Sequence, residues 1–90
     1  MANQTITEER DVTVLKADKT IDCSGKLCPL PVVEASRGIK TIEIGQVLCV
    51  IATDPGSPPD MAAWARQTGH PLLHSELGDG RFIFYFQRAK

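Results

Sequence analysis

The sequence predicts an α+β fold, a two-layer α/β sandwich in which two helices lie on one face of a mixed four-stranded sheet. The patterns along the chain follow the order strand, helix, strand, helix, strand, strand (β-α-β-α-β-β). Two helices cannot cover both faces of a four-stranded sheet, so the economical packing puts both on one face. The last two strands are separated by Gly78-Asp79-Gly80, a hairpin connection, and this antiparallel pair makes the sheet mixed.

Ninety residues make one small domain, and 42% hydrophobic with 23% charged residues is ordinary for a globular chain. The net charge is −1 without a basic stripe, so we expect no direct nucleic-acid binding. The longest apolar runs are far too short to span a bilayer, and Met1 to Asp11 lacks a signal-peptide core. We therefore expect a cytoplasmic protein with no membrane association. The three cysteines favour reactive or buried thiols over a disulfide framework.

Met1 to Asp11 are polar and aperiodic, and we expect an N-terminal extension (1–18) that is flexible, followed by a folded domain (19–90). Within the extension, Val12–Leu15 reads either as a short strand or as an extended lead-in, and Lys16–Lys19 reads as a turn. Thr20–Cys23 is the first predicted strand of the domain, and Ser24-Gly25 ends it.

A helical pattern begins at Pro29. Proline pre-sets its own backbone for the first position of a helix, and Pro31 still falls in the first turn, where a missing N–H breaks no helical bond. Apolar or small residues then recur at the spacing of one buried helix face: Val32, Ala35, Ser36 and Ile39. Glu34 and Arg37 point the other way, where they could pair weakly.

Gln46–Thr53 is a continuous apolar run between Gly45 and Pro55, which predicts a central strand. The second helix starts at Ser57, with Ser57 as the cap and Asp60 completing a capping-box-like pattern. Trp64 falls on the apolar face of this helix.

Gly69 is the expected end of the second helix, and Pro71 blocks its continuation. Leu72–Leu77 and Arg81–Gln87 then form the closing hairpin. The predicted core consists of Val32, Val33, Ala35, Ile39, Val47, Cys49, Ile51, Met61, Trp64, Ala65 and several of Phe82, Phe84 and Phe86.

Cys28 is the residue around which the chain is organised. It stands at or just before a helix start, where the positive end of the macrodipole favours thiolate, the nucleophilic form. The free N–H groups of Leu30 and Val32 are expected to stabilise a negative sulfur. Rigid prolines would hold that sulfur at one place on the surface. The alternative is that Cys28 is merely a small buried residue.

The other candidate residues have plainer interpretations. Cys23 is either a resolving thiol for Cys28 or part of the core, and Cys49 is core. His70 and His74 suggest a metal site together with the cysteines, but no Cys-x-x-Cys pair is present and we expect no metal.

Positive charge could also serve a reactive thiol. Lys26, Arg37 and Lys40 are either solvated or supply positive charge that would favour a thiolate or an acidic partner.

The order and spacing of several residues along the chain resemble the pattern of a known protein family. The resemblance to the TusA (SirA-like) sulfur-carrier family runs from about Thr20 to Arg88 and rests on Gly25, Cys28-Pro29-Leu30-Pro31, Gly45, Thr53-Asp54-Pro55, Trp64 and Gly69-His70. It implies a compact two-layer fold of this element order. It also implies that Cys28 accepts sulfane sulfur as a persulfide and passes it to a partner protein, with Gly25, Pro29 and Pro31 as supporting motif residues and with no cofactor.

The chain departs from the family pattern at Leu30, where many members have an acidic residue, and at Leu27, which is shifted by one position. The departure at Leu30 bears on partner choice, and the candidate partner-binding residues are Lys26, Leu30, Arg37 and Lys40. The resemblance implies a carrier rather than a self-contained enzyme. Its donors and acceptors would be proteins of the sulfurtransferase or desulfurase type, acting in tRNA thiolation, molybdenum-cofactor supply or dissimilatory sulfur metabolism. The alternative is a thiol redox switch or a non-catalytic binding or regulatory module.

Overall fold

A computed structural model describes residues 16–27 and 29–90, so Cys28 and most of the N-terminal extension lie outside the described residues. The observed elements follow the predicted order. They are β2 (Lys19–Cys23), α2 (Leu30–Ile39), β3 (Val47–Ala52), α3 (Ser57–Thr68), β4 (Leu72–Gly78) and β5 (Arg81–Gln87). Among the described residues, no helix is both long enough and apolar enough to cross a lipid bilayer.

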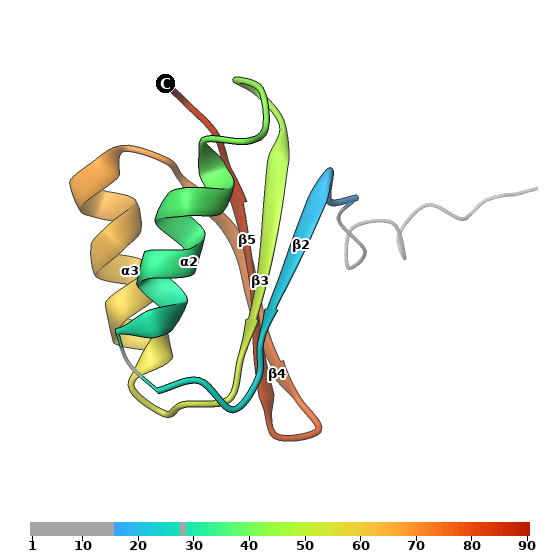
Figure 1. The fold of residues 1–90 in the computed structure, drawn as a ribbon, viewed down its shortest axis with the longest axis vertical. Helices are drawn as coiled ribbons and strands as arrows, with labels where there is room; N and C mark the ends of the chain where they lie inside the picture. Colours follow the sequence, from blue (N-terminus) through green and yellow to red (C-terminus); the bar gives the residue numbers. More distant parts are fainter. Residues whose placement is uncertain (1–15, 28) are drawn as a thin grey trace, which may run out of the picture.

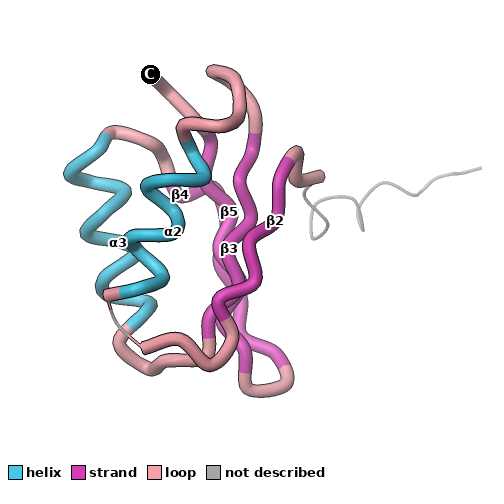
Figure 2. Tube along the Cα trace, in the orientation of Figure 1, coloured by secondary structure: helices cyan, strands magenta, loops and turns pink. Residues whose placement is uncertain are grey.

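The sheet is mixed, as predicted. Its strand order is β2-β3-β5-β4, with β2 parallel to β3 and the other neighbours antiparallel. Figures 1 and 2 show α2 and α3 side by side on one face of the sheet. No described helix or strand covers the other face, which we call the open face. The predicted two-layer α/β sandwich is therefore confirmed.

The core lies between the sheet and the helix layer. Leu48, Val50 and Ala52 of β3 are fully buried there, opposite Phe86, Phe84 and Phe82 of β5 in the antiparallel register. Trp64 and Met61 close the core from α3, and the Trp64 ring meets Phe86 edge to face at 4.9 Å between centroids. The predictions for Ala35, Ile39, Met61 and Trp64 are confirmed.

The prediction was wrong about which face of β3 enters this core. Side chains alternate along a strand, so Val47, Cys49 and Ile51 point to the open face, and Val47 and Ile51 are only partly buried. Cys49 is buried as predicted, but on that second face. The run of apolar residues in β3 carries no alternation, and its sequence therefore could not identify the helix-facing side.

The start of α3 also differs from the prediction. Gly56 occupies the N-cap position, and the helix shows no side-chain capping bond. Instead, the Asp54 carboxylate accepts the N–H of Gly56 at 3.0 Å. Ser57 is the first helical residue, and its side chain is buried with no hydrogen-bond partner for Oγ among the described residues.

The end of α3 agrees with the prediction. Gly69 has a left-handed φ of 83° and donates its N–H to the carbonyl of Ala65 at 3.0 Å. The next residue, His70, is buried, and its Nδ1 accepts the N–H of Ala89 at 3.0 Å. This bond ties the C-terminal end of the chain to the end of α3.

The assignment of the two faces of β3 can be tested by making the same Val→Ala substitution once on each face. Val50→Ala should lower the free energy of unfolding by about 2–3 kcal/mol because it opens a cavity in the core, whereas Val47→Ala should cost less than about 1 kcal/mol. Urea denaturation of both variants measures the difference. Equal losses for the two variants would contradict the assignment of the faces.

His70 should make stability depend on pH. Burial, followed by the nearby charges of Arg88 and Lys90, lowers the pKa of His70, and only the neutral ring can accept the Ala89 N–H. The folded state then binds fewer protons than the unfolded state below pH ~6.5. Stability should be fully present above that pH and fall as the pH drops below it, by at most ~1.4 kcal/mol per pH unit for one proton.

The control for His70 is His70→Asn, whose amide oxygen can accept the same N–H but takes up no proton in this range. Urea midpoints between pH 7.5 and 5.5 should decline more steeply in the wild type than in His70→Asn. His74→Gln should behave like the wild type, since no buried bond depends on His74. Parallel curves for the wild type and His70→Asn would refute the role of His70.

Candidate functional site

The motif loop, residues 24–29, leaves the sheet at the end where β2 and β3 both finish. The backbone N–H of Gly25 donates to Thr53 Oγ1 at 2.8 Å, which joins the loop after β2 to the residue after β3. Gly25 has a φ of +82°, a left-handed conformation that disfavours any side chain. Glycine at this position therefore allows the chain to turn out of the sheet.

Local hydrogen bonds lock the loop on both sides of Cys28. Before it, the Asp22 carboxylate accepts the N–H of Ser24 at 2.9 Å, and the hydrogen bonds from Ser24 lower the Asp22 pKa. After it, the N–H of Leu30 donates to the carbonyl of Leu27 at 2.8 Å. The Leu30 N–H is therefore not free to face a sulfur anion, and that part of the prediction was wrong.

The helix begins one residue later than predicted. Pro29 occupies the N-cap position of α2, and the N–H of Val33 donates to the Pro29 carbonyl at 3.1 Å. Pro31, in the first turn, is fully buried, while Pro29 and Leu30 are exposed. Cys28 itself lies outside the described residues, and its sequence position is directly before this N-cap. The buried Pro31 anchors the first turn that follows the cysteine.

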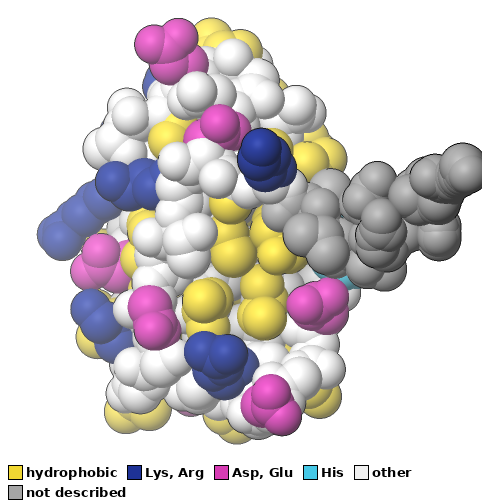
Figure 3. Space-filling model, turned by 90° about the vertical axis from the view of Figure 1, so that its right-hand side faces the viewer, with side chains coloured by type: hydrophobic (Ala, Val, Ile, Leu, Met, Phe, Trp, Pro, Cys, Tyr) yellow, Lys and Arg dark blue, Asp and Glu magenta, His cyan; other side chains and the backbone are white. Residues whose placement is uncertain are grey.

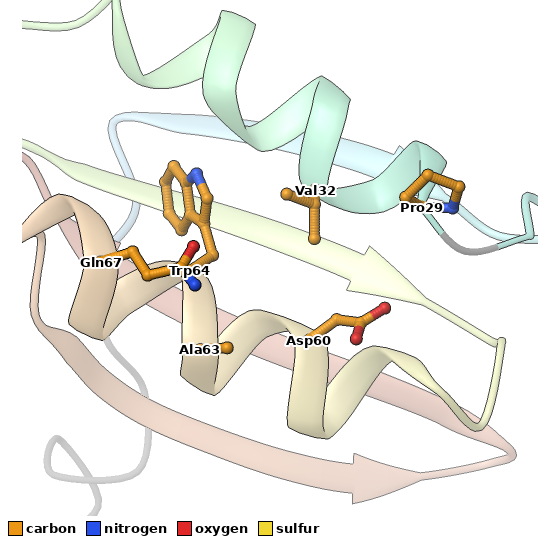
Figure 4. Close-up of a pocket in the computed structure, with 6 residues that line it drawn as sticks. All are labelled: Pro29, Val32, Asp60, Ala63, Trp64 and Gln67. Atoms are coloured by element: carbon orange, nitrogen blue, oxygen red, sulfur yellow. The ribbon is translucent and has the colours of Figure 1, made fainter.

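A groove runs between the two helices beside the motif. It has a volume of about 350 Å³, and Figure 4 shows its two walls, one from α2 and one from α3. It is lined by Pro29, Val32, Asp60, Ala63, Trp64 and Gln67. Figure 1 shows that both helices start at the same end of the molecule, so their positive macrodipole ends both lie near the motif loop.

Exposed leucines stand on both sides of the cysteine in the sequence. Leu27 is 68% exposed and Leu30 is 47% exposed. We call Leu27, Pro29 and Leu30 the motif patch. Large apolar side chains held out in water next to a groove are typical of a protein-docking surface. Leu30 was predicted from the sequence to bind a partner and Leu27 was not, although a leucine inside a polar turn is a usable signal.

The structure brings only some of the predicted partner-binding residues to the motif. Lys26 lies in the motif loop and pairs with Glu34 at 3.9 Å, so Glu34 does not pair with Arg37 as expected. Arg37 and Lys40 lie at the other end of α2, and the helical rise puts Lys40 about 15 Å from Leu30 along the axis. A role for these two cations in partner binding stays a prediction.

The two described cysteines are free thiols in buried surroundings. Burial, and next the Glu34 carboxylate, raises the pKa of Cys23, whose side chain lies in the core. Burial likewise raises the pKa of Cys49, although hydrogen bonds with Tyr85 and Thr20 oppose the shift. Both thiols are therefore protonated at neutral pH, and the surroundings of Cys23 favour the core alternative.

The histidines have structural contacts of their own. His70 packs against Trp64 with 5.7 Å between ring centroids, and His74 Nε2 lies 3.1 Å from Glu76 Oε1. Within residues 16–27 and 29–90, no group of three or more His, Cys, Asp or Glu residues could hold a metal ion.

Comparison with known proteins gives the same picture as the motif. Residues 19–88 match the family model described as "Sulfurtransferase TusA". A putative sulfur carrier protein from Aquifex aeolicus is 49% identical over 83% of this chain, although the chain spans only 38% of that protein. The sulfur carrier protein TusA from Allochromatium vinosum is 44% identical over 80% of this chain and 95% of its own length.

A solved structure has the same fold. The crystal structure of a SirA-like protein from Desulfitobacterium hafniense superimposes with a TM-score of 0.69 at 25% identity, covering 80% of this chain and 99% of the other. The matched region contains the whole motif loop and every helix and strand described above. The chain therefore belongs to the TusA family of sulfur carrier proteins.

Proposed function

We propose that this protein carries sulfane sulfur as a persulfide on Cys28 and hands it to an acceptor protein. The observation that carries the proposal is the position of this cysteine. It directly precedes the N-cap of α2, in a loop bound to the sheet through Gly25 and flanked by exposed leucines. The names of the related proteins, which are sulfur carriers, support it.

The chemistry needs only thiols. The Cys28 thiolate attacks the outer sulfur of a donor persulfide, forming a new S–S bond as the donor's S–S bond breaks and the donor cysteine leaves as a thiolate. An acceptor thiolate then attacks the outer sulfur on Cys28, which leaves as a thiolate in turn. Each transfer exchanges one S–S bond for another, so no net oxidation, metal or cofactor is required.

The surroundings of the motif favour a reactive sulfur at this one position. A thiol beside a helix N-terminus has its pKa lowered, and both helices of this protein start near the motif loop. A thiol buried in the core has its pKa raised, as at Cys23 and Cys49. The same chain thus combines one activated thiol with two inert ones.

The motif patch and the adjacent groove suit a protein partner. Leu27 and Leu30 offer apolar contact area, and the groove between α2 and α3 can receive a protruding side chain or turn. We infer that donors and acceptors of the sulfurtransferase or desulfurase type dock here, with Lys26 at the edge of the contact. A reducing compartment such as the cytoplasm suits a carrier that must keep its thiols reduced.

The alternative of a Cys23–Cys28 redox switch has less support. The Cys23 side chain is fully buried and its raised pKa keeps it protonated, whereas a resolving cysteine has to attack as a thiolate. No described feature favours a purely regulatory binding module.

Loading of sulfur should depend on Cys28 alone. After incubation with glutathione persulfide, the wild type should gain the mass of one sulfur atom on the peptide that contains Cys28. Cys28→Ser should fold normally and gain none. Cys23→Ser and Cys49→Ser are the matched controls and should load as the wild type does.

Peptide mapping by mass spectrometry makes this measurement. Sulfur on Cys23 or Cys49 of the wild type, or undiminished loading of Cys28→Ser, would show that the proposal is wrong.

The motif patch should matter for protein donors but not for small ones. Leu30→Asp should slow sulfur transfer from a persulfide-loaded sulfurtransferase about tenfold, equivalent to about 1.4 kcal/mol of lost docking energy. Loading by glutathione persulfide should change less than about twofold, since a small donor needs no docking surface.

The control variant is Ile44→Asp, because Ile44 is 66% exposed but lies in the connection between α2 and β3. It should leave both rates unchanged. Equal slowing of the two donors by Leu30→Asp would mean that the side chain affects the thiol rather than docking. An effect of Ile44→Asp as large as that of Leu30→Asp would remove the motif patch from the interface.

A further inference from the structure

The two edges of the sheet are protected unequally. At the β4 edge, the register with β5 is interrupted by a bulge between Leu72 and His74, a common way to prevent further strand pairing. At the other edge, β2 runs in unbroken register with β3 from Lys19 to Cys23. In the described part of the chain, β2 pairs with β3 alone, so alternate backbone N–H and C=O groups of β2 face away from the sheet.

A groove follows this β2 edge on the helix side of the sheet. It has a volume of about 200 Å³ and is lined by Lys19, Ile21, Glu34, Arg37, Gly38 and Thr41. The lining residues from 34 to 41 recur at the spacing of one side of a helix. Gly38 is buried, and a side chain there would run into Ile21. Helix α2 and strand β2 therefore meet closely at the level of Ile21.

The charges of the groove lie at opposite ends of β2. Figure 1 shows that α2 starts at the end where β2 finishes and runs back over the strand. Glu34 precedes Gly38 by four residues, about 6 Å along the helix axis, which puts it near Cys23. Burial and then the Glu34 carboxylate raise the pKa of the Cys23 thiol, which agrees with this position. Lys19 lies two residues, about 7 Å, on the other side of Ile21.

A second copy of the chain fits this edge. A two-fold rotation about an axis through Ile21, perpendicular to the sheet, sets two β2 strands antiparallel with all five residues of each strand paired. Lys19 then lies opposite Cys23 of the second copy, and the two Ile21 residues lie opposite each other. Opposite residues of an antiparallel pair share a face, so the helix-facing side chains of the two copies meet on one side.

The same rotation matches the charges. It brings Lys19 of the second copy to the Cys23 end of the first, at the level of Glu34, and Arg37 of the second copy approaches from the neighbouring helix. Within one copy, Glu34 contacts Lys26 at 3.9 Å, and both side chains are partly exposed, so this ion pair contributes little. By symmetry the contact between Glu34 and Lys19 forms twice, and each acidic end of a groove meets a basic end.

The open face of the sheet is also compatible with this pairing. Figure 3 shows hydrophobic side chains gathered over the middle of the open face, with charged side chains around them. Strand β2 contributes Thr20 and Asp22 to this face, and both are exposed. In the two-fold arrangement, Thr20 lies opposite Asp22 of the second copy, where a hydroxyl can donate to a carboxylate. The copies would thus join through polar side chains on this face.

We propose that two copies of this chain associate through the outer edges of β2, antiparallel about Ile21, and form one continuous sheet. A second copy supplies backbone partners, an apolar contact at the axis and complementary charges at once. The groove between α2 and α3 has a different lining from the groove at this edge, so both copies keep the motif patch open to other proteins. This inference is independent of the proposed sulfur chemistry.

The first test is sedimentation equilibrium of the full chain with exchanged charges. The wild type should pass from monomer to dimer over about a hundredfold range of concentration. Lys19→Glu and Glu34→Lys should each weaken association at least about tenfold, because each variant places like charges across the interface. The double variant Lys19→Glu/Glu34→Lys restores opposite charges and should return to within about threefold of the wild type.

The control variant is Arg66→Glu. It makes the same change of charge as Lys19→Glu, but Arg66 is exposed on α3 and does not line the groove at the β2 edge. Its association should match that of the wild type. A loss as large as that of Lys19→Glu would show that net charge, rather than the β2 edge, governs association, and would overturn the proposal.

Hydrogen exchange followed by NMR identifies the surface. The β2 amides that do not bond to β3 should gain at least about tenfold protection as the concentration rises, while the amides bonded to β3 change little. In a sample that mixes labelled and unlabelled protein, nuclear Overhauser contacts should join Lys19 of one copy to Cys23 of the other.

Three further results would overturn the proposal. One is a wild type that stays monomeric over the whole range. Another is a double variant that associates no better than the single variants. The third is protection of the outer β2 amides that is the same in the monomer at every concentration, which would assign the edge to another segment of the same chain.

Discussion

The parallel pairing of β2 with β3 is the constraint on which the rest of the structure depends. The carboxyl ends of two neighbouring parallel strands lie at the same end of the sheet, so the connections that follow these strands leave side by side. Here the first connection is the motif loop and the second leads into α3, and the Gly25–Thr53 hydrogen bond joins them. Both helices must then start at that end of the sheet and run back over the same face. The groove between α2 and α3 is a direct result of this topology.

Burial gives Cys23 and Cys49 a chemical environment different from the one expected for Cys28. Cys23 faces the helix layer and Cys49 faces the other side of the sheet, yet burial raises the pKa of both. Covering a thiol removes the water that would solvate its anion, so the cost falls on the thiolate whatever the face. Cys28 is the thiol whose sequence position, before the N-cap of α2, offers the opposite influence. A carrier with several cysteines can in this way confine its chemistry to one of them.

The exposed surface is divided as well. The helix end that carries the motif patch displays leucines beside a groove, whereas the β4 edge is blunted by a bulge and carries the His74–Glu76 contact. Such a division lets one end of a small protein associate briefly with partners while another edge resists strand pairing. It agrees with a carrier whose specificity comes from docking rather than from an enclosed substrate pocket.

The sequence by itself determined the element order, the hairpin at Gly78-Asp79-Gly80, the end of α3 at Gly69 and the helix start after Cys28. These features depend on local backbone chemistry, in which glycine and proline restrict the conformations of a few neighbouring residues. Only the tertiary structure decided which side of β3 entered the core, because an uninterrupted apolar run satisfies either face. It also decided that Ser57 is buried rather than capping, that Glu34 pairs with Lys26, and that Leu27 and Asp60 belong to the site region. Each of these depends on contacts between residues that are distant in sequence or on competition between alternative partners, and local patterns carry no information about that competition.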